Sequence, residues 1–308
     1  MDRKTVLNRS LALVLALLVT LAAAPFALAQ SAPIDVVDMT GRAIHLDGPA
    51  TRIVALTASD CEILYALGAG DALVGRGTYC DYPPEVLEIT TVQSGSSTNY
   101  EEIVALEPQV VLMSTMSQTE EQAALLESAG ITVVVSAAQD IEGVYAAIEL
   151  IGAVVGRDEE AANVIAGMKD SFAAIAEKAA GDTSAAGKTV YFEVSPLQWG
   201  LWTAGTGTFM DELASMVGLS NAFADVSGWG EISEEQVLER DPDYIVSITM
   251  YFGEGPTPVE EILGREGWGN LKAVKNGAIL NADSNEISRP APRLVNAAVT
   301  LYEFVYGE

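Results

Sequence analysis

One short pattern occurs twice in this chain, once in each half. The first copy, "NYEEIVALEPQVVLM", covers residues 99–113, and the second, "SEEQVLERDPDYIVSI", covers residues 233–248. In each copy a glutamate stands seven residues before a proline and a short strand-like run: Glu101 with Pro108, and Glu235 with Pro242. Proline ends a helix and biases the residue before it toward extended geometry. The pattern therefore predicts the same helix-to-strand unit in both halves.

A long amphipathic pattern lies between the two copies. Over Asp158–Ala180, "DEEAANVIAGMKDSFAAIAEKAA", apolar residues recur at spacings of three and four, which predicts a single helix. At 1.5 Å per residue this helix would be roughly 34 Å long. We expect it to be a strut between two lobes, because the repeated unit falls once on each side of it. One more covering helix on a single large sheet is the alternative.

Short apolar runs alternate with helical patterns on both sides of this helix. Such alternation predicts parallel sheets with helices on both faces, so the expected class is α/β with two Rossmann-like lobes. Residues 34–46 are typical of a hairpin, and Ser59 or Asp60 is expected to cap the helix after the first buried strand. Further helices are predicted at Gln118–Ala129, Thr208–Val217, Pro258–Leu263 and Pro292–Val305.

The first residues have the pattern of a secretory signal peptide. Charged residues precede an apolar run that starts at Leu11, and Ala27-Leu28-Ala29 is a small-residue cleavage site. Cleavage after Ala29 is expected, because the run is short for a membrane anchor. No cysteine stands directly after the run, where a lipid would be attached. The expected division is then signal peptide 1–29, N-terminal lobe 30–157, joining helix 158–181 and C-terminal lobe 182–308.

Charge and cysteine content narrow the class of protein further. The net charge of −27 makes nucleic acid and anionic lipid poor partners. The two cysteines, Cys61 and Cys80, form an even count in an exported chain, and this predicts a disulfide between them. Two cysteines with a single histidine, His45, do not make a zinc site.

Aromatic residues gather in the segments that follow the predicted strands. Ligands of open parallel sheets bind at the carboxyl ends of the strands. An aromatic cleft at that edge would suit a large, partly planar ligand. Arg289 and Arg293 add hydrogen-bond donors there, although either could instead pair with Glu286. The aromatic residues in question are Tyr79, Trp199, Trp202, Trp229, Tyr251 and Phe252.

Two other classes of function remain open at this point. A secreted hydrolytic enzyme could use paired carboxylates, but the chain has no G-x-S-x-G, H-E-x-x-H or P-loop motif. A protein that binds free zinc or manganese would need several histidine and carboxylate ligands, which a single histidine does not favour. We therefore expect a binding protein without catalytic residues, a metal site or a resident cofactor.

Four segments together resemble a known family. They are "RIVALTASDCEILYALGAGDALVGRGTYCDYPP", "NYEEIVALEPQVVLM", "ISEEQVLERDPDYIV" and "SRPAPRL". They resemble the periplasmic binding proteins that deliver vitamin B12, ferric siderophores or haem to ABC importers. The resemblance implies two α/β lobes on one long helix, limited hinge motion, and a permease dimer with its ATPase as partner. It also implies that Glu101 and Glu235 dock onto the two permease subunits. We expect a monomer.

For the ligand, "TYCDYPP" is most similar to the vitamin B12 binders of this family. That similarity implies contacts from Tyr79, Trp202, Trp229 and Arg289, with Arg293 as a second choice of arginine. The B12 binder has tryptophans where this chain has "SGSST" at 94–98 and "MST" at 113–115, so ferric siderophores stay open. Haem binders of the family supply a tyrosine or histidine ligand. His45 belongs to the expected hairpin, which leaves Tyr79 and Tyr251 for that role.

Overall fold

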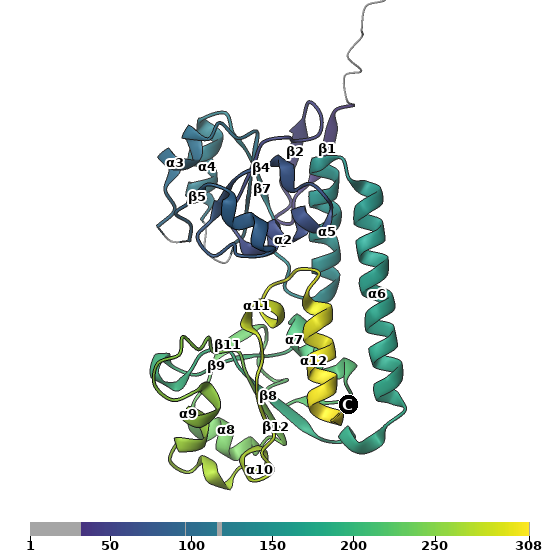
Figure 1. The fold of residues 1–308 in the computed structure, drawn as a ribbon, viewed down its shortest axis with the longest axis vertical. Helices are drawn as coiled ribbons and strands as arrows, with labels where there is room; N and C mark the ends of the chain where they lie inside the picture. Colours follow the sequence, from purple (N-terminus) through teal and green to yellow (C-terminus); the bar gives the residue numbers. More distant parts are fainter. Residues whose placement is uncertain (1–31, 96, 116–118, 308) are drawn as a thin grey trace, which may run out of the picture.

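The computed structural model describes residues 32–95, 97–115 and 119–307. The predicted signal peptide and its cleavage site lie outside these residues. Two α/β lobes stand one above the other along the long axis of the molecule, and helices run down one side of both (Figure 1). No helix in the described part of the chain is both long and apolar enough to cross a bilayer.

The N-terminal lobe is built on a five-stranded parallel sheet. Its strand order is β5-β4-β3-β6-β7, so the chain starts in the middle of the sheet and extends it on both sides. The antiparallel hairpin of β1 and β2 precedes it, as predicted. The strands are β1 (Ile34–Val37), β2 (Ala43–Leu46), β3 (Ile53–Ala55), β4 (Leu73–Gly77), β5 (Thr91–Val92), β6 (Val110–Met113) and β7 (Thr132–Val135). The helices are α2 (Ala58–Ala66), α3 (Tyr100–Ala105), α4 (Glu120–Ser128) and α5 (Ile141–Val155).

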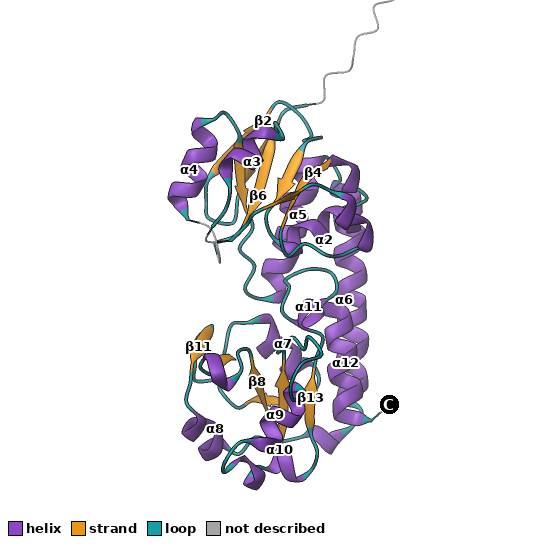
Figure 2. Cartoon of the chain, turned by 60° about the vertical axis from the view of Figure 1, so that its left-hand side comes forward, coloured by secondary structure: helices purple, strands orange, loops and turns teal. Residues whose placement is uncertain are grey.

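The C-terminal lobe has a four-stranded parallel sheet of order β10-β8-β12-β13 and a separate antiparallel pair, β9 with β11. Figure 2 shows the strands of both lobes with helices around them. The strands are β8 (Thr189–Glu193), β9 (Trp202–Ala204), β10 (Ser220–Asn221), β11 (Trp229–Glu231), β12 (Tyr244–Ser247) and β13 (Ile279–Asn281). The helices are α7 (Phe209–Met216), α8 (Glu234–Arg240), α9 (Pro258–Gly264), α10 (Lys272–Lys275), α11 (Ser284–Ile287) and α12 (Leu294–Tyr306).

The joining helix is α6 (Asp158–Ala180), which confirms the amphipathic prediction. Its buried stripe includes Ile165, Met168, Phe172 and Ile175. One part of α6 packs against α5 of the N-terminal lobe and another against α7 and α12 of the C-terminal lobe. In Figure 1 it runs alongside both lobes. Because one rigid element is buried against both lobes, it restrains how far they can move apart.

The sequence analysis missed α5. Ten of its fifteen residues are buried, and its exposed face carries only two charged residues, Glu142 and Glu149, so its polar stripe is narrow. Asp140 caps its first turn by accepting from the Gly143 N–H at 2.7 Å. At Gly152, α5 lies so close to α6 that an added Cβ would be 2.7 Å from the Ala161 Cβ. The helix is thus recognised by its fit between the sheet and α6 rather than by an amphipathic pattern.

The repeated unit forms α3 with β6 in one lobe and α8 with β12 in the other. One detail of the prediction was wrong. Glu107 and Asp241, the residues before the two prolines, have φ of 48° and 45° and are left-handed rather than extended. A left-handed residue stops a helix and turns the chain away, and the following proline prevents the helix from continuing. The duplication therefore extends to the backbone conformation of the turn.

Candidate ligand-binding cleft

A cavity of about 250 Å³ lies between the two lobes. The N-terminal lobe supplies most of its wall, and Ser288, Arg289 and Pro290 supply the side from the C-terminal lobe. The N-terminal part of the wall is Leu56, Thr57, Ala58, Ser59, Asp60, Ile63, Tyr79, Ser94, Gly95, Ser114, Ser136, Ala138, Gln139 and Ala147.

Hydroxyl side chains line the carboxyl edge of the N-terminal sheet. Thr57 follows β3, Ser94 follows β5, Ser114 follows β6 and Ser136 follows β7, each within two residues of the strand end. Parallel strands bring their carboxyl ends to one edge, so these four oxygens converge on the cavity. Two of them, Ser94 and Ser114, fall in the segments where the sequence departs from the B12 binders. The aromatic prediction overlooked this set.

Asp60 lies beneath the hydroxyls. Its carboxylate is fully buried and accepts from Ser136 Oγ at 2.6 Å and from Thr57 Oγ1 at 2.5 Å. Thr57 is also the N-cap of α2, because its oxygen accepts from the Asp60 N–H. The predicted cap, Ser59 or Asp60, was therefore two or three residues too late. Burial raises the pKa of Asp60 to about 6, although the two hydroxyl hydrogen bonds act in the opposite direction.

This pKa makes the stability of the fold depend on pH. The reference pKa of the aspartate is 3.8, and the folded-state value is about 6. The contribution of Asp60 to stability is then fully present below about pH 4 and is lost as the pH rises through about 6, in total about 3 kcal/mol at about 1.4 kcal/mol per pH unit. Relative to wild type, Asp60→Asn should gain up to that amount in unfolding free energy between about pH 4 and about pH 7, measured by urea denaturation.

The exposed Asp71 serves as the matched control, because Asp71→Asn removes the same charge from the same lobe. The pH-dependent gain expected of Asp60→Asn should be absent from Asp71→Asn if it comes from the buried site and not from the loss of one negative charge. Parallel curves for Asp60→Asn and wild type would show that Asp60 titrates normally.

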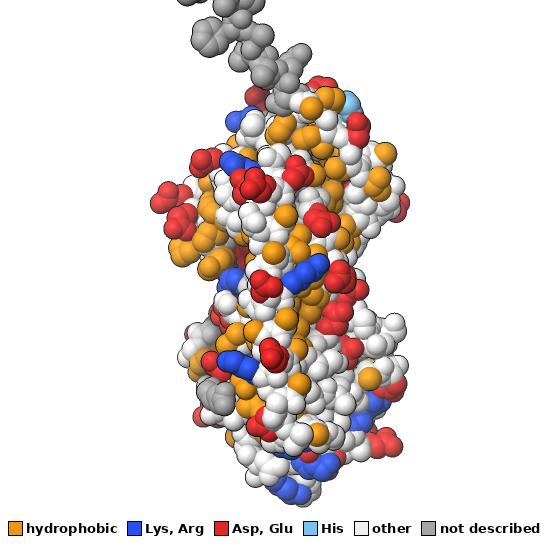
Figure 3. Space-filling model, turned by 90° about the vertical axis from the view of Figure 1, so that its right-hand side faces the viewer, with side chains coloured by type: hydrophobic (Ala, Val, Ile, Leu, Met, Phe, Trp, Pro, Cys, Tyr) orange, Lys and Arg blue, Asp and Glu red, His pale blue; other side chains and the backbone are white. Residues whose placement is uncertain are grey.

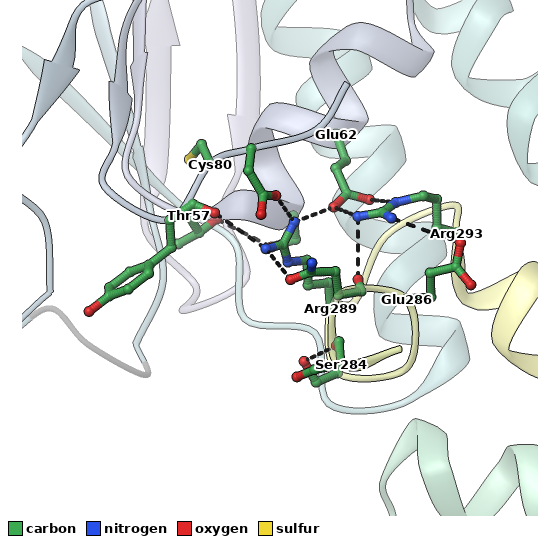
Figure 4. Close-up of polar contacts among 12 residues, drawn as sticks. Thr57, Glu62, Cys80, Ser284, Glu286, Arg289 and Arg293 are labelled. Atoms are coloured by element: carbon green, nitrogen blue, oxygen red, sulfur yellow. Dashed lines mark hydrogen bonds and ion pairs between the residues drawn. The ribbon is translucent and has the colours of Figure 1, made fainter. Parts of the chain in front are cut away.

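Arg289 lies at the cavity, as predicted, but both Nη atoms of its guanidinium donate to other groups of the protein (Figure 4). Nη1 donates to Glu62 Oε1 at 3.0 Å and to Asp81 Oδ1 at 2.6 Å. Nη2 donates to Asn285 Oδ1 at 2.6 Å and to the Tyr79 carbonyl oxygen at 3.3 Å. Glu62, Asp81 and Tyr79 belong to the N-terminal lobe, so Arg289 ties the two lobes together.

Arg293 does not line the cavity. Its Nε and Nη2 donate to the two carboxylate oxygens of Glu62 at 2.9 and 2.6 Å, and its guanidinium lies 3.9 Å from the Tyr82 ring centroid. Glu286, the partner considered in the sequence analysis, is more distant, at 3.9 Å from Arg293 Nη1. Glu62 is therefore shared by two arginines of the opposite lobe, with only 2% of its side chain exposed. We call these three residues the Glu62 clamp.

Trp202 and Trp229 lie on short strands, not in loops as predicted. β9 pairs with β11 so that Trp202 faces Glu231 and Ala204 faces Trp229. Residues at alternate positions share a face, so both tryptophans lie on one side of this pair, while Thr203 on the opposite side is fully buried. The structure thus presents the two rings together on the C-terminal lobe.

Trp229 also reaches the other lobe. Its Nε1 donates to Gln139 Oε1 at 3.0 Å, and Gln139 lines the cavity. The Trp229 ring packs edge-on against Phe209, with centroids 5.4 Å apart. This tryptophan is therefore held beside the cavity by residues of both lobes.

The remaining predicted aromatics lie farther along the C-terminal lobe. Tyr251 and Phe252 line a second hollow of about 260 Å³ together with Pro196 and Pro256. Trp199 is 76% exposed, and Phe252 is 85% exposed. Tyr79, the aromatic residue at the cavity itself, is 74% exposed.

The predicted Cys61–Cys80 disulfide is absent from the structure, in which both residues are free, buried thiols. The prediction was right that they are neighbours. Their sulfurs lie 3.9 and 3.8 Å from the same carbonyl oxygen, that of Ala55. The neighbouring Cys80 thiol and burial raise the pKa of Cys61 well above its usual value. Both sulfurs thus serve as small buried groups in the core.

Glu101 and Glu235 are both exposed, near the start of α3 and α8. Their neighbours have internal roles: Glu102 accepts from the Gln93 N–H at 3.0 Å, and Glu234 accepts from Trp268 Nε1 at 2.9 Å. In Figure 1 both helices lie on the side of their lobe away from α6. One glutamate of each pair is thus turned to solvent at matching places on the two lobes.

The described residues contain no group of three or more His, Cys, Asp or Glu side chains that could hold a metal ion. His45 lies on β2, as predicted, with its Nδ1 2.8 Å from Asp35 Oδ1 at the surface.

Two α/β lobes, one long joining helix and a cavity between the lobes define a class: solute-binding proteins built from two lobes on one long helix. The comparison with known families agrees. The chain belongs to the periplasmic binding protein family, whose model matches residues 53–286.

Individual relatives cover most of the chain. An uncharacterised ABC transporter substrate-binding lipoprotein of Bacillus subtilis is 34% identical, over 90% of this chain and 86% of that protein. A cobalamin-binding protein of Halobacterium salinarum is also 34% identical, over 87% of this chain and 72% of that protein. The solved periplasmic vitamin B12-binding protein of Vibrio cholerae is 25% identical, with a TM-score of 0.69, covering 83% of this chain and 97% of that one.

Proposed function

We propose that this protein is exported, captures a metal-containing chelate in the cleft between its lobes, and delivers it to the permease of an ABC importer. The observation that carries the proposal is the cavity at the carboxyl edge of the N-terminal sheet, closed from the other lobe by residues 288–290. Relatives named as ABC transporter substrate-binding and cobalamin-binding proteins support it. In this proposal the mature protein consists of an N-terminal lobe (residues 30–157), the joining helix (158–181) and a C-terminal lobe (182–308).

The ligand is larger than the cavity. Cavities for small molecules commonly measure about 300–1,000 Å³, and this one is smaller. We infer that the cavity takes one edge of the chelate and that the rest lies against the aromatic side chains of the C-terminal lobe. Trp202 and Trp229 share a face there, and Trp199, Tyr251 and Phe252 extend the apolar surface. A corrinoid or a ferric siderophore has the size and partly apolar surface for this arrangement.

Delivery requires contact with a permease. We infer that Glu101 and Glu235 dock onto cationic side chains of the two permease subunits. The support is their exposure on α3 and α8 and the duplicated turn that follows each helix. A two-fold symmetric partner presents the same surface twice, and two matching glutamates on two lobes suit that symmetry. A monomeric binding protein is sufficient for this role.

Ligand binding tests the cleft directly. We expect Trp202→Ala and Trp229→Ala each to weaken binding of the chelate on the order of tenfold, since each removes an aromatic contact of about 1–2 kcal/mol. Isothermal titration calorimetry with cyanocobalamin and with a ferric hydroxamate siderophore measures this without relying on tryptophan fluorescence. Val299→Ala, a truncation on α12 of the same lobe, should bind as wild type does.

Two results would count against the proposal. Wild-type affinity in both tryptophan variants would place the ligand elsewhere. Turnover of the ligand by the purified protein, detected by mass spectrometry before and after incubation, would favour a hydrolytic enzyme instead.

A further inference from the structure

The cleft offers no uncompensated positive charge to a ligand. Among the described residues that line the cavity, Arg289 is the one cation and Asp60 the one anion. All four Nη hydrogens of Arg289 are directed at Glu62, Asp81, Asn285 and the Tyr79 carbonyl. The Arg289 side chain is only 11% exposed, so little of it is accessible to a ligand.

The charges next to the cavity sum to a net negative value. Arg289 and Arg293 are balanced by Glu62 and Asp81, and the Asp60 carboxylate remains in excess. The whole molecule adds to this, with a net charge of −27. Figure 3 shows carboxylates spread over both lobes on one side of the molecule. An anion entering the cleft is therefore opposed by the field of the protein as well as by the nearby carboxylates.

The hydroxyls of the floor reinforce this polarity. Both Asp60 oxygens accept, one from Thr57 Oγ1 and the other from Ser136 Oγ. The single proton of Thr57 is thus used, so Ser59 must donate in the 3.2 Å contact between Ser59 Oγ and Thr57 Oγ1. Thr57 Oγ1 also accepts from the Asp60 N–H, so its hydrogen-bonding capacity is used up. With their protons directed inward, Ser59 and Ser136 have only oxygen lone pairs left for a ligand. This part of the floor accepts hydrogen bonds and does not donate them.

We propose that this cleft selects chelates that are neutral or cationic and carry N–H donors on the edge facing Ser59 and Ser136, and that it rejects chelates bearing free carboxylates. The inference rests on the proposed function, because it takes the cleft as the ligand site. Primary amides fit the floor: their NH₂ groups donate to the acceptor oxygens. A carboxylate has no donor and would meet both the lone pairs and the Asp60 charge.

Asp81 is the residue whose substitution should change the charge selection. It is the more exposed of the two carboxylates on Arg289, with 47% of its side chain accessible against 2% for Glu62. Asp81→Asn keeps an acceptor oxygen for Nη1 but removes one negative charge. The charge of Arg289 then becomes available to an anionic ligand.

Two matched pairs of probes test the proposal by calorimetry. One is cyanocobalamin against its derivative with peripheral amides hydrolysed to carboxylates, and the other is haemin dimethyl ester against haemin. In whichever pair binds, we expect the neutral member to bind more tightly by on the order of tenfold or more. Asp81→Asn should reduce this ratio several-fold by improving affinity for the acid form. The control Asp71→Asn, the same charge change outside the cavity wall, should leave the ratio unchanged.

The possible outcomes distinguish a failure of the charge selection from a failure of the proposed function. Equal or tighter binding of the acid form by the wild type overturns the charge selection while leaving the cleft as a ligand site. An unchanged ratio in Asp81→Asn, or an equal change in Asp71→Asn, shows that the Arg289 pairing does not set the selection. If no member of either pair and no ferric hydroxamate binds, the proposed function fails, and the inference fails with it.

Discussion

Replacing Glu62 by glutamine should lower the free energy of unfolding by about 3 kcal/mol. Glu62 is buried and binds Arg289 and Arg293 of the opposite lobe at 3.0 and 2.6 Å. Removing one partner of a buried ion pair leaves the other charge without compensation, which costs about 3–5 kcal/mol. The lower end applies here because Arg289 keeps Asp81 and Arg293 keeps a more distant Glu286. Urea denaturation measures the difference.

An exposed ion pair provides the comparison. Arg157 and Glu160 are 2.8 Å apart, but both side chains are more than 40% exposed. Glu160→Gln should cost less than about 1 kcal/mol, because exposed pairs are weak. If Glu62→Gln lowered the free energy of unfolding no more than Glu160→Gln does, the Glu62 clamp would join the lobes without contributing to stability.

The spacing of apolar residues in the sequence predicted the helices and strands that have one buried side and one polar, solvent-facing side. The stripe of α6 and the alternation in the β1–β2 hairpin are examples, and both were located to within a residue or so. α5 was missed for the opposite reason, since most of its surface is covered by other elements. The left-handed Glu107 and Asp241 could not be derived from their residue types, because proline mainly favours extended geometry at the preceding position.

The candidate site was predicted in part. Tyr79 was predicted at the cavity because it follows a predicted strand, and it does line the cavity. The same rule, applied to hydroxyl side chains as well as aromatic ones, would also have found Thr57, Ser94, Ser114 and Ser136. The state of Arg289 could not be read from the sequence. Its carboxylate partners Glu62 and Asp81 lie more than two hundred residues away along the chain and meet it only when the lobes assemble.

Substituting both Glu101 and Glu235 by alanine should abolish uptake of the ligand while leaving its affinity unchanged. Both side chains are exposed on α3 and α8, and neither lines the cavity. A hydrogen bond to a charged group contributes about 1.5–3 kcal/mol, so losing two would weaken docking by on the order of a hundredfold to ten-thousandfold. Each single variant should retain part of the uptake, since one lobe still docks.

The experiment needs cells that carry the importer and depend on this protein for the ligand, together with calorimetry on the purified variants. Glu149→Ala/Glu303→Ala is the matched control. It removes the same charge from one exposed glutamate per lobe, on α5 and α12, which pack against α6. Uptake should be normal in this control, because it loses the same two negative charges but keeps the surfaces of α3 and α8 intact. Normal uptake in Glu101→Ala/Glu235→Ala would refute docking through these residues, and reduced affinity with an intact fold would place them in the binding site instead.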